Sequence, residues 1–494
     1  MNTSAKRSPT LSRNVIWNVL GSFAPLLVAI AAVPLVIAEL GLERFGVLTL
    51  IWAVLGYFNL FDFGVGQALT KLLAERRETE TGQVLAPLVW TGMSLLLLMG
   101  LIAAVILWFL TPWLVLSLLK IPEHLKEEVI TSFYWLCLGL PIVITTAGLR
   151  GILEAYQEFK KINLVRIPLG VLIFIAPLLV LPFSSSLVVI MWVLLAGRLL
   201  AWLFYLKYSF QTMPALMHKV DLAKEHLRPL ITFGGWMTVS GVIGPVMVYF
   251  DRFVIGAVVS MAAVAYYVTP HEVVSKLWIF PSALVGVLFP ALAASLVNQR
   301  SRVAGLLDRG QTLTFFCLLP IIIMVYMFAE EGLAMWLSDE FAEKSFLVLR
   351  LLIVGVFINC MAAVPSSLIK AAGRPDLNAK LHLVELPFYL IALWYTTVHL
   401  GIVGAAWVWL IRVVIDTVVL FLIANSLLPE ARQAQIKHFI YIICSLLVLL
   451  AASYIQNIPA KFILVFVVGL ISLLMIWSDI KQHGTFSTPK DIEP

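Results

Sequence analysis

The amino-acid sequence predicts an all-α, polytopic membrane protein with about fourteen transmembrane helices. Its 494 residues are 61% hydrophobic and only 13% charged, whereas soluble globular chains are nearer half apolar and a quarter charged. Apolar runs of about 20 residues recur along the whole chain, and a helix of that length crosses roughly 30 Å of hydrocarbon. A single soluble core cannot bury so much apolar surface, so we expect nearly the whole chain to lie in the membrane.

Fourteen segments are expected to span the bilayer. They are residues 14–38, 45–70, 84–118, 129–149, 162–182, 186–207, 229–256, 262–297, 311–332, 345–369, 379–398, 401–428, 436–456 and 458–478. The first follows a basic N-terminus and is too long for the apolar part of a cleaved signal peptide. The runs 84–118 and 262–297 exceed what a bilayer needs, so we expect them to tilt or to extend beyond it.

The distribution of Lys and Arg between these segments tests the predicted number of spans. With the N-terminus inside, the inner connections and the span ends next to them hold 23 Lys and Arg residues. The outer connections hold only 5, namely Arg44, Lys120, Lys126, Lys344 and Lys461. Cytoplasmic loops are enriched in Lys and Arg, and a missed helix would invert every later loop. The alternation therefore supports fourteen spans and predicts that both termini are cytoplasmic.

The two halves of the chain repeat short patterns at similar offsets. Leu164–Pro168 is echoed by 383–387, and Trp192 followed by Arg198 is echoed by Trp407 followed by Arg412. We therefore predict an N-terminal lobe of six helices (1–210), a cytoplasmic linker (211–228) and a C-terminal lobe of six helices (229–428). Helices thirteen and fourteen (429–480) and a polar tail (481–494) follow. An even number of helices per lobe gives both lobes the same orientation in the membrane.

Motifs for covalent chemistry are missing from the sequence. There is no Gly-Lys dipeptide and hence no P-loop for ATP. His271–Ser275 departs from the HExxH zinc motif at its last position, so the second metal ligand is missing. The basic residues lie in short loops rather than in a stripe interleaved with aromatics, as nucleic-acid binding would require. We therefore expect a transporter rather than an enzyme, without cofactor, metal or nucleic-acid partner.

Three stretches resemble one family of transporters. They are residues 62–71 (DFGVGQALTK), residues 251–256 (DRFVIG) followed by Tyr266 and Tyr267, and residues 401–406 (GIVGAA) followed by Arg412. Their order and spacing are similar to those of bacterial polysaccharide-unit (oligosaccharide, O-antigen) flippases, which belong to the multidrug/oligosaccharidyl-lipid/polysaccharide exporters. The resemblance covers nearly the whole chain.

The resemblance implies a fold, a place and a substrate. The fold would be two six-helix lobes arranged in a V, followed by two further helices, in the bacterial inner membrane. The activity would be translocation of an undecaprenyl-diphosphate-linked oligosaccharide from the cytoplasmic to the outer leaflet, by alternating access and for the synthesis of a surface polysaccharide. Membrane lipids, a polysaccharide polymerase and the export machinery are the partners that it suggests.

Charged residues that the predicted spans place towards the bilayer centre are the candidates for function, because each costs roughly 2.5–3.5 kcal/mol there. The six basic ones are Arg166, Arg198, Arg252, Lys276, Arg350 and Arg412. The five acidic ones are Asp62, Asp251, Glu272, Glu385 and Asp416. Arginine suits phosphate through its planar fork. Since the resemblance places helices seven and eight along the cavity, Arg252 and Lys276 are the leading cations for the diphosphate, and Arg166 is a third.

The other charges have coupling or structural interpretations. Asp62, Asp251, Glu272 and Glu385 are candidates for carrying a coupling ion or for pairing. Arg198, Arg412 and Asp416 are structural candidates, with both arginines expected near helix ends. The spacing of four residues allows two ion pairs on single helix faces, Glu272 with Lys276 and Arg412 with Asp416. Matching positions in the repeat would let Arg166 and Glu385 face each other.

Other functions remain open on the sequence alone. A cation-coupled multidrug exporter of the same superfamily is one, although twelve helices and a net acidic interior would suit it better. A peptidoglycan-precursor flippase is another. A membrane glycan polymerase or ligase is the nearest enzyme, but such enzymes have a large outer loop with essential basic residues, which is not seen in this chain.

Overall fold

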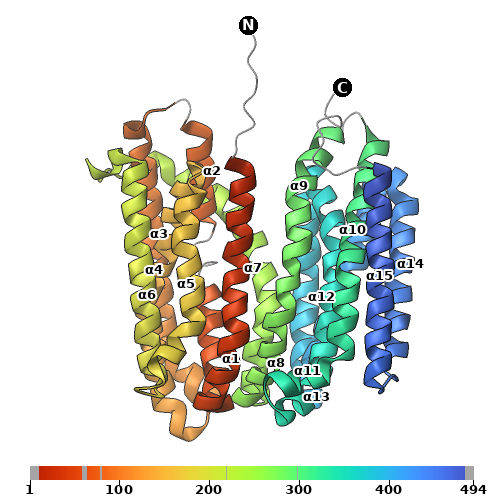
Figure 1. Cartoon of the computed structure of the whole chain (residues 1–494). Helices are drawn as coiled ribbons and strands as arrows, with labels where there is room; N and C mark the ends of the chain where they lie inside the picture. Colours follow the sequence, from red (N-terminus) through yellow and green to blue (C-terminus); the bar gives the residue numbers. More distant parts are fainter. Residues whose placement is uncertain (1–9, 58–63, 78–79, 219, 297–298, 484–494) are drawn as a thin grey trace. The chain divides into compact units, whose positions relative to one another are not determined.

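The described part of the chain is entirely helical. The computed structural model describes residues 10–57, 64–77, 80–218, 220–296 and 299–483. Within these residues the α-helices α1 to α15 are joined by short turns, and no strand occurs. The all-α class predicted from the sequence is confirmed (Figure 1).

Two long helices each contain two of the predicted spans, or parts of two. Helix α1 (Thr10–Tyr57) continues through Gly41, where φ is 79° and ψ is 161°. Helix α13 (Pro375–Leu427) continues through Gly401, where φ is 60° and ψ is −144°. These conformations are essentially confined to glycine, which has no Cβ to clash with the backbone. Since α13 has 53 residues and about 20 suffice to cross the bilayer, each glycine marks the joint between two crossings.

The remaining helices of the first half match the predicted spans closely. Helix α3 (Gly82–Trp113) runs on as a π-helical turn (Leu114–Leu118), and α4 is Lys126–Ala155. Helices α5 and α6 are Phe159–Val180 and Leu187–Thr212. Helix α4 lies in the centre of this group, where 72% of its apolar stretch is buried, against 22% for α3. The exposed apolar side of α3 is what a lipid-facing helix requires.

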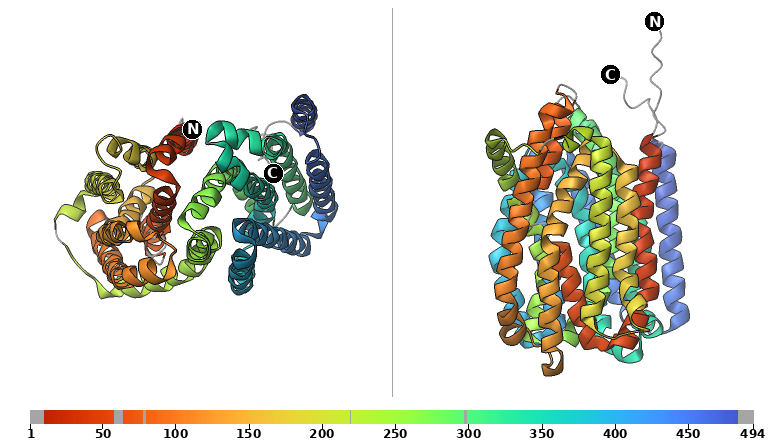
Figure 2. Two further views of the ribbon diagram at one scale, coloured as in Figure 1. Left: turned by 90° about the horizontal axis from the view of Figure 1, so that it is seen from below. Right: turned by 90° about the vertical axis from the view of Figure 1, so that its left-hand side faces the viewer.

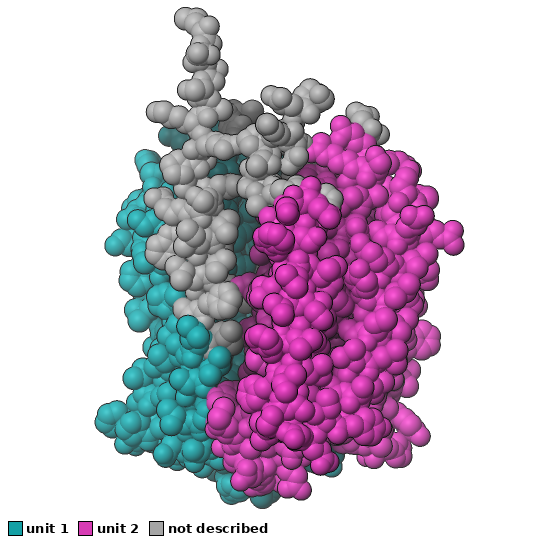
Figure 3. Space-filling view, turned by 45° about the vertical axis from the view of Figure 1, so that its right-hand side comes forward, with its two compact units in different colours: residues 1–265 teal, residues 266–494 magenta. Residues whose placement is uncertain are grey.

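The chain divides into two compact units, unit 1 (residues 1–265) and unit 2 (residues 266–494), coloured separately in Figure 3. Unit 1 also contains α2 (Val65–Arg76) and α7 (Leu227–Val258), and α7 packs on α1, α2 and α3. The division falls inside α8. The predicted lobes, 1–210 and 229–428, were defined by the sequence repeat rather than by packing, and they stay a prediction.

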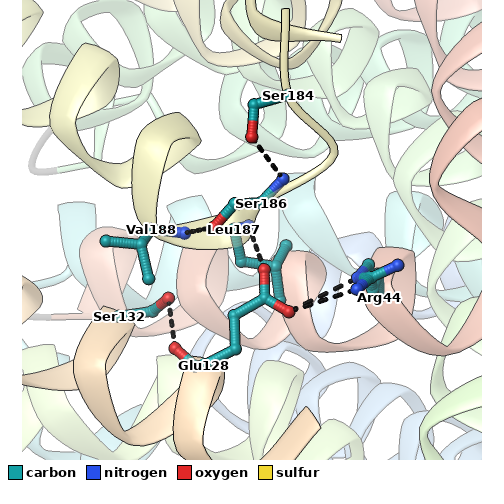
Figure 4. Close-up of polar contacts among 7 residues, drawn as sticks. All are labelled: Arg44, Glu128, Ser132, Ser184, Ser186, Leu187 and Val188. Carbon is teal, nitrogen blue, oxygen red and sulfur yellow. Dashed lines mark hydrogen bonds and ion pairs between the residues drawn. The ribbon is translucent and has the colours of Figure 1, made fainter. Parts of the chain in front are cut away.

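A carboxylate joins three helices of unit 1 at the end predicted to face outward (Figure 4). The Leu187 N–H at the start of α6 donates to Oε1 of Glu128 at 2.6 Å. Nε and Nη2 of Arg44, in α1, each lie 3.4 Å from Oε2 of the same side chain. A helix N-terminus favours a negative charge. Glu128, in α4, therefore binds the start of α6 and, through Arg44, also contacts α1.

Unit 2 is built around α12 (Asp339–Ala371), of which 78% of the apolar stretch is buried. The predicted run 262–297 forms α8 (Met261–Ser275), a 3-10 turn (Lys276–Trp278) and α9 (Ile279–Ser295). The predicted run 311–332 forms α10 (Arg300–Met327) and the start of the short α11 (Ala329–Trp336). Helices α9, α10, α12 and α13 share an apolar core around Leu292, Leu307 and Leu368.

The last two helices, α14 (Arg432–Ala452) and α15 (Ile458–His483), pack on α10. Ion pairs hold α15 towards both of its ends, Lys461 with Glu331 and Arg309 with Asp479 at 2.8 Å. Between them α15 presents apolar side chains outward, including Phe466 at 71% exposure. In the described residues, ten helices are long and apolar enough to cross a membrane, and within each unit the long helices run side by side (Figure 2). The chain is a multi-pass membrane protein.

The backbone conformation of Gly401 in α13 leads to a prediction about stability. We expect Gly401→Ala to destabilise the fold by about 1–3 kcal/mol, because alanine is strained at this φ and ψ. Gly469→Ala is the matched control, since it lies within α15 and its added Cβ also meets no atom within 4 Å. That change should be neutral or stabilising by up to about 1 kcal/mol. Thermal unfolding of the purified variants in detergent measures both, and equal midpoints would show that the joint is not strained.

Candidate functional site

The charges of α7 lie within unit 1. Arg252 is only 3% exposed and Asp251 is fully buried. The Arg252 guanidinium carbon lies 4.7 Å from the centre of the Tyr249 ring, and the Arg252 N–H donates to Asp251 Oδ1 at 2.8 Å. Arg252 is therefore packed among other side chains. Contact of Arg252 with a diphosphate stays a prediction.

Lys276 and Glu272 form the ion pair that their spacing predicts. Lys276 Nζ lies 3.2 Å from Glu272 Oε2, and the side chains are 40% and 32% exposed. Lys276 opens the 3-10 turn between α8 and α9. Pairs with this much exposure contribute little to stability, so Lys276 can exchange its partner at low cost. The structure thus leaves Lys276 as a candidate for substrate contact.

A cluster of polar side chains lies inside α13, where its two segments fold back on each other at Gly401. We call it the α13 charge cluster; its members are His382, Glu385, Tyr389, Arg412 and Asp416. Nε2 of His382 lies 3.2 Å from Oδ1 of Asp416, which is 3% exposed. The Arg412 guanidinium carbon lies 5.8 Å from the centre of the Tyr389 ring. His382 was not among the sequence candidates, because only the fold-back at Gly401 brings it to Asp416.

Glu385 is the unusual member of the α13 charge cluster. Both of its carboxylate oxygens are buried, and neither has a hydrogen-bond partner among the described residues. Burying an ionised carboxylate without hydrogen bonds is costly. Glu385 therefore stays a candidate for carrying a coupling ion.

Three arginines meet in unit 1 at a pocket of about 90 Å³, which we call the arginine pocket. Arg150 (α4), Arg166 (α5) and Arg198 (α6) line it together with Thr146, Tyr205 and Ala201. Arg150 pairs with Glu154 at 3.2 Å. The structure gives Arg166 and Arg198 no ion pair or hydrogen bond within the described residues. Arg150 lies one residue beyond the predicted span 129–149, in an inner connection, so the sequence did not indicate that it shares a pocket with the other two.

The depth of two arginines differs from our expectation. Arg198 is the twelfth residue of the 26-residue helix α6, and Arg412 is likewise near the middle of the second segment of α13, between Gly401 and Leu427. Neither arginine is near a helix end, so the side chain of neither is long enough to reach the membrane–water interface. The expectation that they lie near helix ends was wrong, because the predicted runs 186–207 and 401–428 nearly coincide with α6 and with the second segment of α13, and each run already places its arginine near the middle.

Two expectations from the sequence are not tested by these contacts. Asp62 lies outside the described residues. Arg166 belongs to unit 1 and Glu385 to unit 2, and their facing each other stays a prediction.

The comparisons with known proteins agree with the fold. A family model described as "Polysaccharide biosynthesis protein" matches residues 11–296. This chain belongs to the polysaccharide biosynthesis protein family. A relative from Shigella flexneri, named "Putative O-antigen transporter", is 30% identical over 414 residues, which are 83% of this chain and 97% of the relative.

Solved structures with little sequence identity share the fold of this family member. An inward-facing multidrug resistance MATE transporter of the MOP superfamily superposes with a TM-score of 0.72 at 15% identity, covering 85% of this chain and 99% of the transporter. The lipid II flippase MurJ in an inward closed conformation superposes with a TM-score of 0.69 at 12% identity, covering 95% of this chain and 99% of the flippase. The expected MATE-like fold is confirmed.

The contacts within the α13 charge cluster lead to a prediction about stability. We expect Asp416→Asn to lower the free energy of unfolding by about 1–3 kcal/mol, because it removes the buried carboxylate that lies 3.2 Å from His382 Nε2. Glu385→Gln should cost little, since the carboxylate that it removes makes no hydrogen bond to a described residue. Thermal unfolding in detergent measures both variants. An equal loss from the two would show that Glu385 is a structural charge.

Proposed function

We propose that this protein is a flippase that carries an undecaprenyl-diphosphate-linked oligosaccharide from the cytoplasmic to the outer leaflet of the bacterial inner membrane. The observation that carries the proposal is the match to a putative O-antigen transporter over 97% of that protein's length. The fold shared with a lipid II flippase supports it. A transporter named for O-antigen and a flippase fold together favour movement of a lipid-linked glycan over covalent chemistry.

The architecture supports a transporter rather than a glycan polymerase. On the side predicted to face outward, the helices of the described chain are joined by short links, such as 119–125, 181–186 and 453–457. The clustered charges of the described chain lie within helices and not in these links. They form the arginine pocket in unit 1 and the α13 charge cluster in unit 2. Charges within membrane helices are typical of substrate and ion pathways.

A flippase also fits better than a cation-coupled multidrug exporter. The lipid II flippase covers 95% of this chain, while the multidrug transporter covers 85%. Helices α14 and α15 follow the twelve helices that form the two predicted lobes. We propose that lobes 1–210 and 229–428 alternate in giving access from the two sides of the membrane, as repeats in secondary transporters do.

Glu385 is our candidate for the group that couples transport to an ion gradient. Its buried oxygens make no hydrogen bond to described residues, whereas Asp251 accepts one from Arg252 and Glu272 is paired with Lys276. Binding of a proton or a sodium ion would offset the cost of burying its charge. Arg252, Lys276 and Arg166 remain the candidates for contact with the diphosphate.

Deleting the gene tests the proposal in the cell. We expect surface polysaccharide to be lost while its undecaprenyl-linked unit is still made and accumulates on the cytoplasmic face. A plasmid copy of the unaltered gene should restore export. Extraction of the lipid-linked unit, with its exposure on intact spheroplasts measured by a lectin, distinguishes the two faces. Units that reach the outer face but are not joined would identify a polymerase instead.

A further inference from the structure

The arginine pocket has an excess of positive charge. Arg150 is neutralised in part by Glu154, at 3.2 Å. Arg166 and Arg198 line the same pocket and have no ion pair or hydrogen bond within the described residues. Three guanidinium groups against one carboxylate leave two positive charges at one place. Because an unpaired charge among membrane helices is costly, such a pocket favours an anionic ligand.

All three arginines of the pocket lie within their helices rather than in the connections between them. Arg166 is the eighth residue of α5, and Arg198 is the twelfth of the 26 residues of α6. At about 1.5 Å per residue, Arg198 is roughly 16 Å from one end of its helix and about 20 Å from the other. Hydrogen bonds fix this part of α6, since Tyr205 donates to the Ile162 carbonyl at 3.3 Å and Trp202 to Thr145 at 3.0 Å.

An apolar groove adjoins the arginine pocket. It has a volume of about 390 Å³ and lies between α5 and α6, lined by Leu172, Leu200 and Phe204 among others. The groove and the pocket share Leu169 and Ala201. Leu200 and Phe204 are 57% and 48% exposed, as expected of side chains that meet lipid. A cationic pocket that continues into an open apolar groove is complementary to an anion with a long hydrocarbon tail.

We infer that this composite site binds a polyprenyl diphosphate, with the diphosphate in the arginine pocket and the first part of the chain in the α5–α6 groove. The inference rests on the proposed function and adds to it a place on unit 1 where the lipid part of the substrate is held. Two unpaired arginines match a diphosphate ester, which carries about two negative charges. Arginine binds such oxygens in bidentate fashion.

An ordinary anionic phospholipid is the rival occupant. Its phosphate group carries one negative charge and stays in the headgroup region, outside the hydrocarbon core. The arginine pocket instead reaches the middle of α6, which is farther along a membrane helix than the headgroup region at its ends. Charge and depth therefore both favour a lipid that is being translocated.

Binding by the full chain in nanodiscs tests the inference without any sugar. The probes are undecaprenyl diphosphate, the uncharged undecaprenol, phosphatidylglycerol and inorganic diphosphate, each measured by native mass spectrometry. We expect Arg166→Gln/Arg198→Gln to weaken undecaprenyl diphosphate binding at least about tenfold and to leave undecaprenol unchanged. Lys207→Gln, which removes a cation of α6 outside the pocket, is the matched control and should bind as the unaltered protein does.

The groove is tested separately. Leu200→Trp should fill it and weaken binding of both undecaprenyl diphosphate and undecaprenol, while Leu203→Trp, on the same helix but outside the groove, should not. If the double glutamine variant unfolds, Arg166→Lys/Arg198→Lys keeps the charges and should retain part of the affinity.

Three results would overturn the inference. They are unchanged binding by the double glutamine variant, unchanged binding by Leu200→Trp, and phosphatidylglycerol binding as tightly as undecaprenyl diphosphate. None of these three results would contradict the proposed function, because the gene-deletion experiment tests that function independently. Conversely, specific binding by a protein that proves dispensable for export would contradict the function alone.

Discussion

The cost of an unpaired charge in hydrocarbon constrains this molecule more than any other interaction. Each such charge costs roughly 2.5–3.5 kcal/mol at the bilayer centre, which is a large fraction of a typical folding free energy. Most membrane charges in the described chain are paired. His382 pairs with Asp416 across the α13 joint, Lys276 pairs with Glu272, and the Arg252 guanidinium lies over an aromatic ring. The groups left without a partner in the described residues are therefore the informative ones.

Those groups differ between the two units. Unit 1 has two cations, Arg166 and Arg198, lining one pocket, and unit 2 has an acid, Glu385, whose oxygens make no hydrogen bond to described residues. A translocated anion would neutralise the first, and a small cation would neutralise the second. The division suits a transporter in which one lobe holds the lipid diphosphate and the other responds to an ion gradient. The six basic and five acidic residues predicted within the membrane nearly cancel over the whole chain. Because the unpaired cations and the unpaired acid lie in different units, this near balance is compatible with an anionic substrate.

Much of the fold could be predicted from the sequence, and the reasons are physical. The length of hydrocarbon sets the length of an apolar run, so the spans 84–118, 162–182 and 186–207 agree with α3, α5 and α6 within a few residues. Local spacing likewise predicted the pair of Glu272 with Lys276. Gly41 lies in the predicted break between the spans 14–38 and 45–70, and the structure has a kink there within the long helix α1.

The sites could be predicted only in part, because they depend on contacts between helices. Nothing local indicates that His382 meets Asp416, which requires the fold-back at Gly401. Arg150 lies beyond its apolar run and was therefore assigned to a loop, yet α4 extends to Ala155 and brings it to the arginine pocket. Apolar runs underestimate helix length wherever polar residues complete the last turns, and depth in the membrane is then misjudged.

Transport by the purified protein tests the central claim most directly. The protein would be reconstituted into liposomes that contain an undecaprenyl-diphosphate-linked oligosaccharide in both leaflets, and a glycosidase added outside would remove the glycans that it can reach. We predict that vesicles with the protein lose the glycans that protein-free vesicles protect, while a labelled phosphatidylglycerol in the same vesicles stays protected. Protection of the inner glycans, or exposure of the phospholipid at the same rate, would contradict a flippase for lipid-linked oligosaccharides.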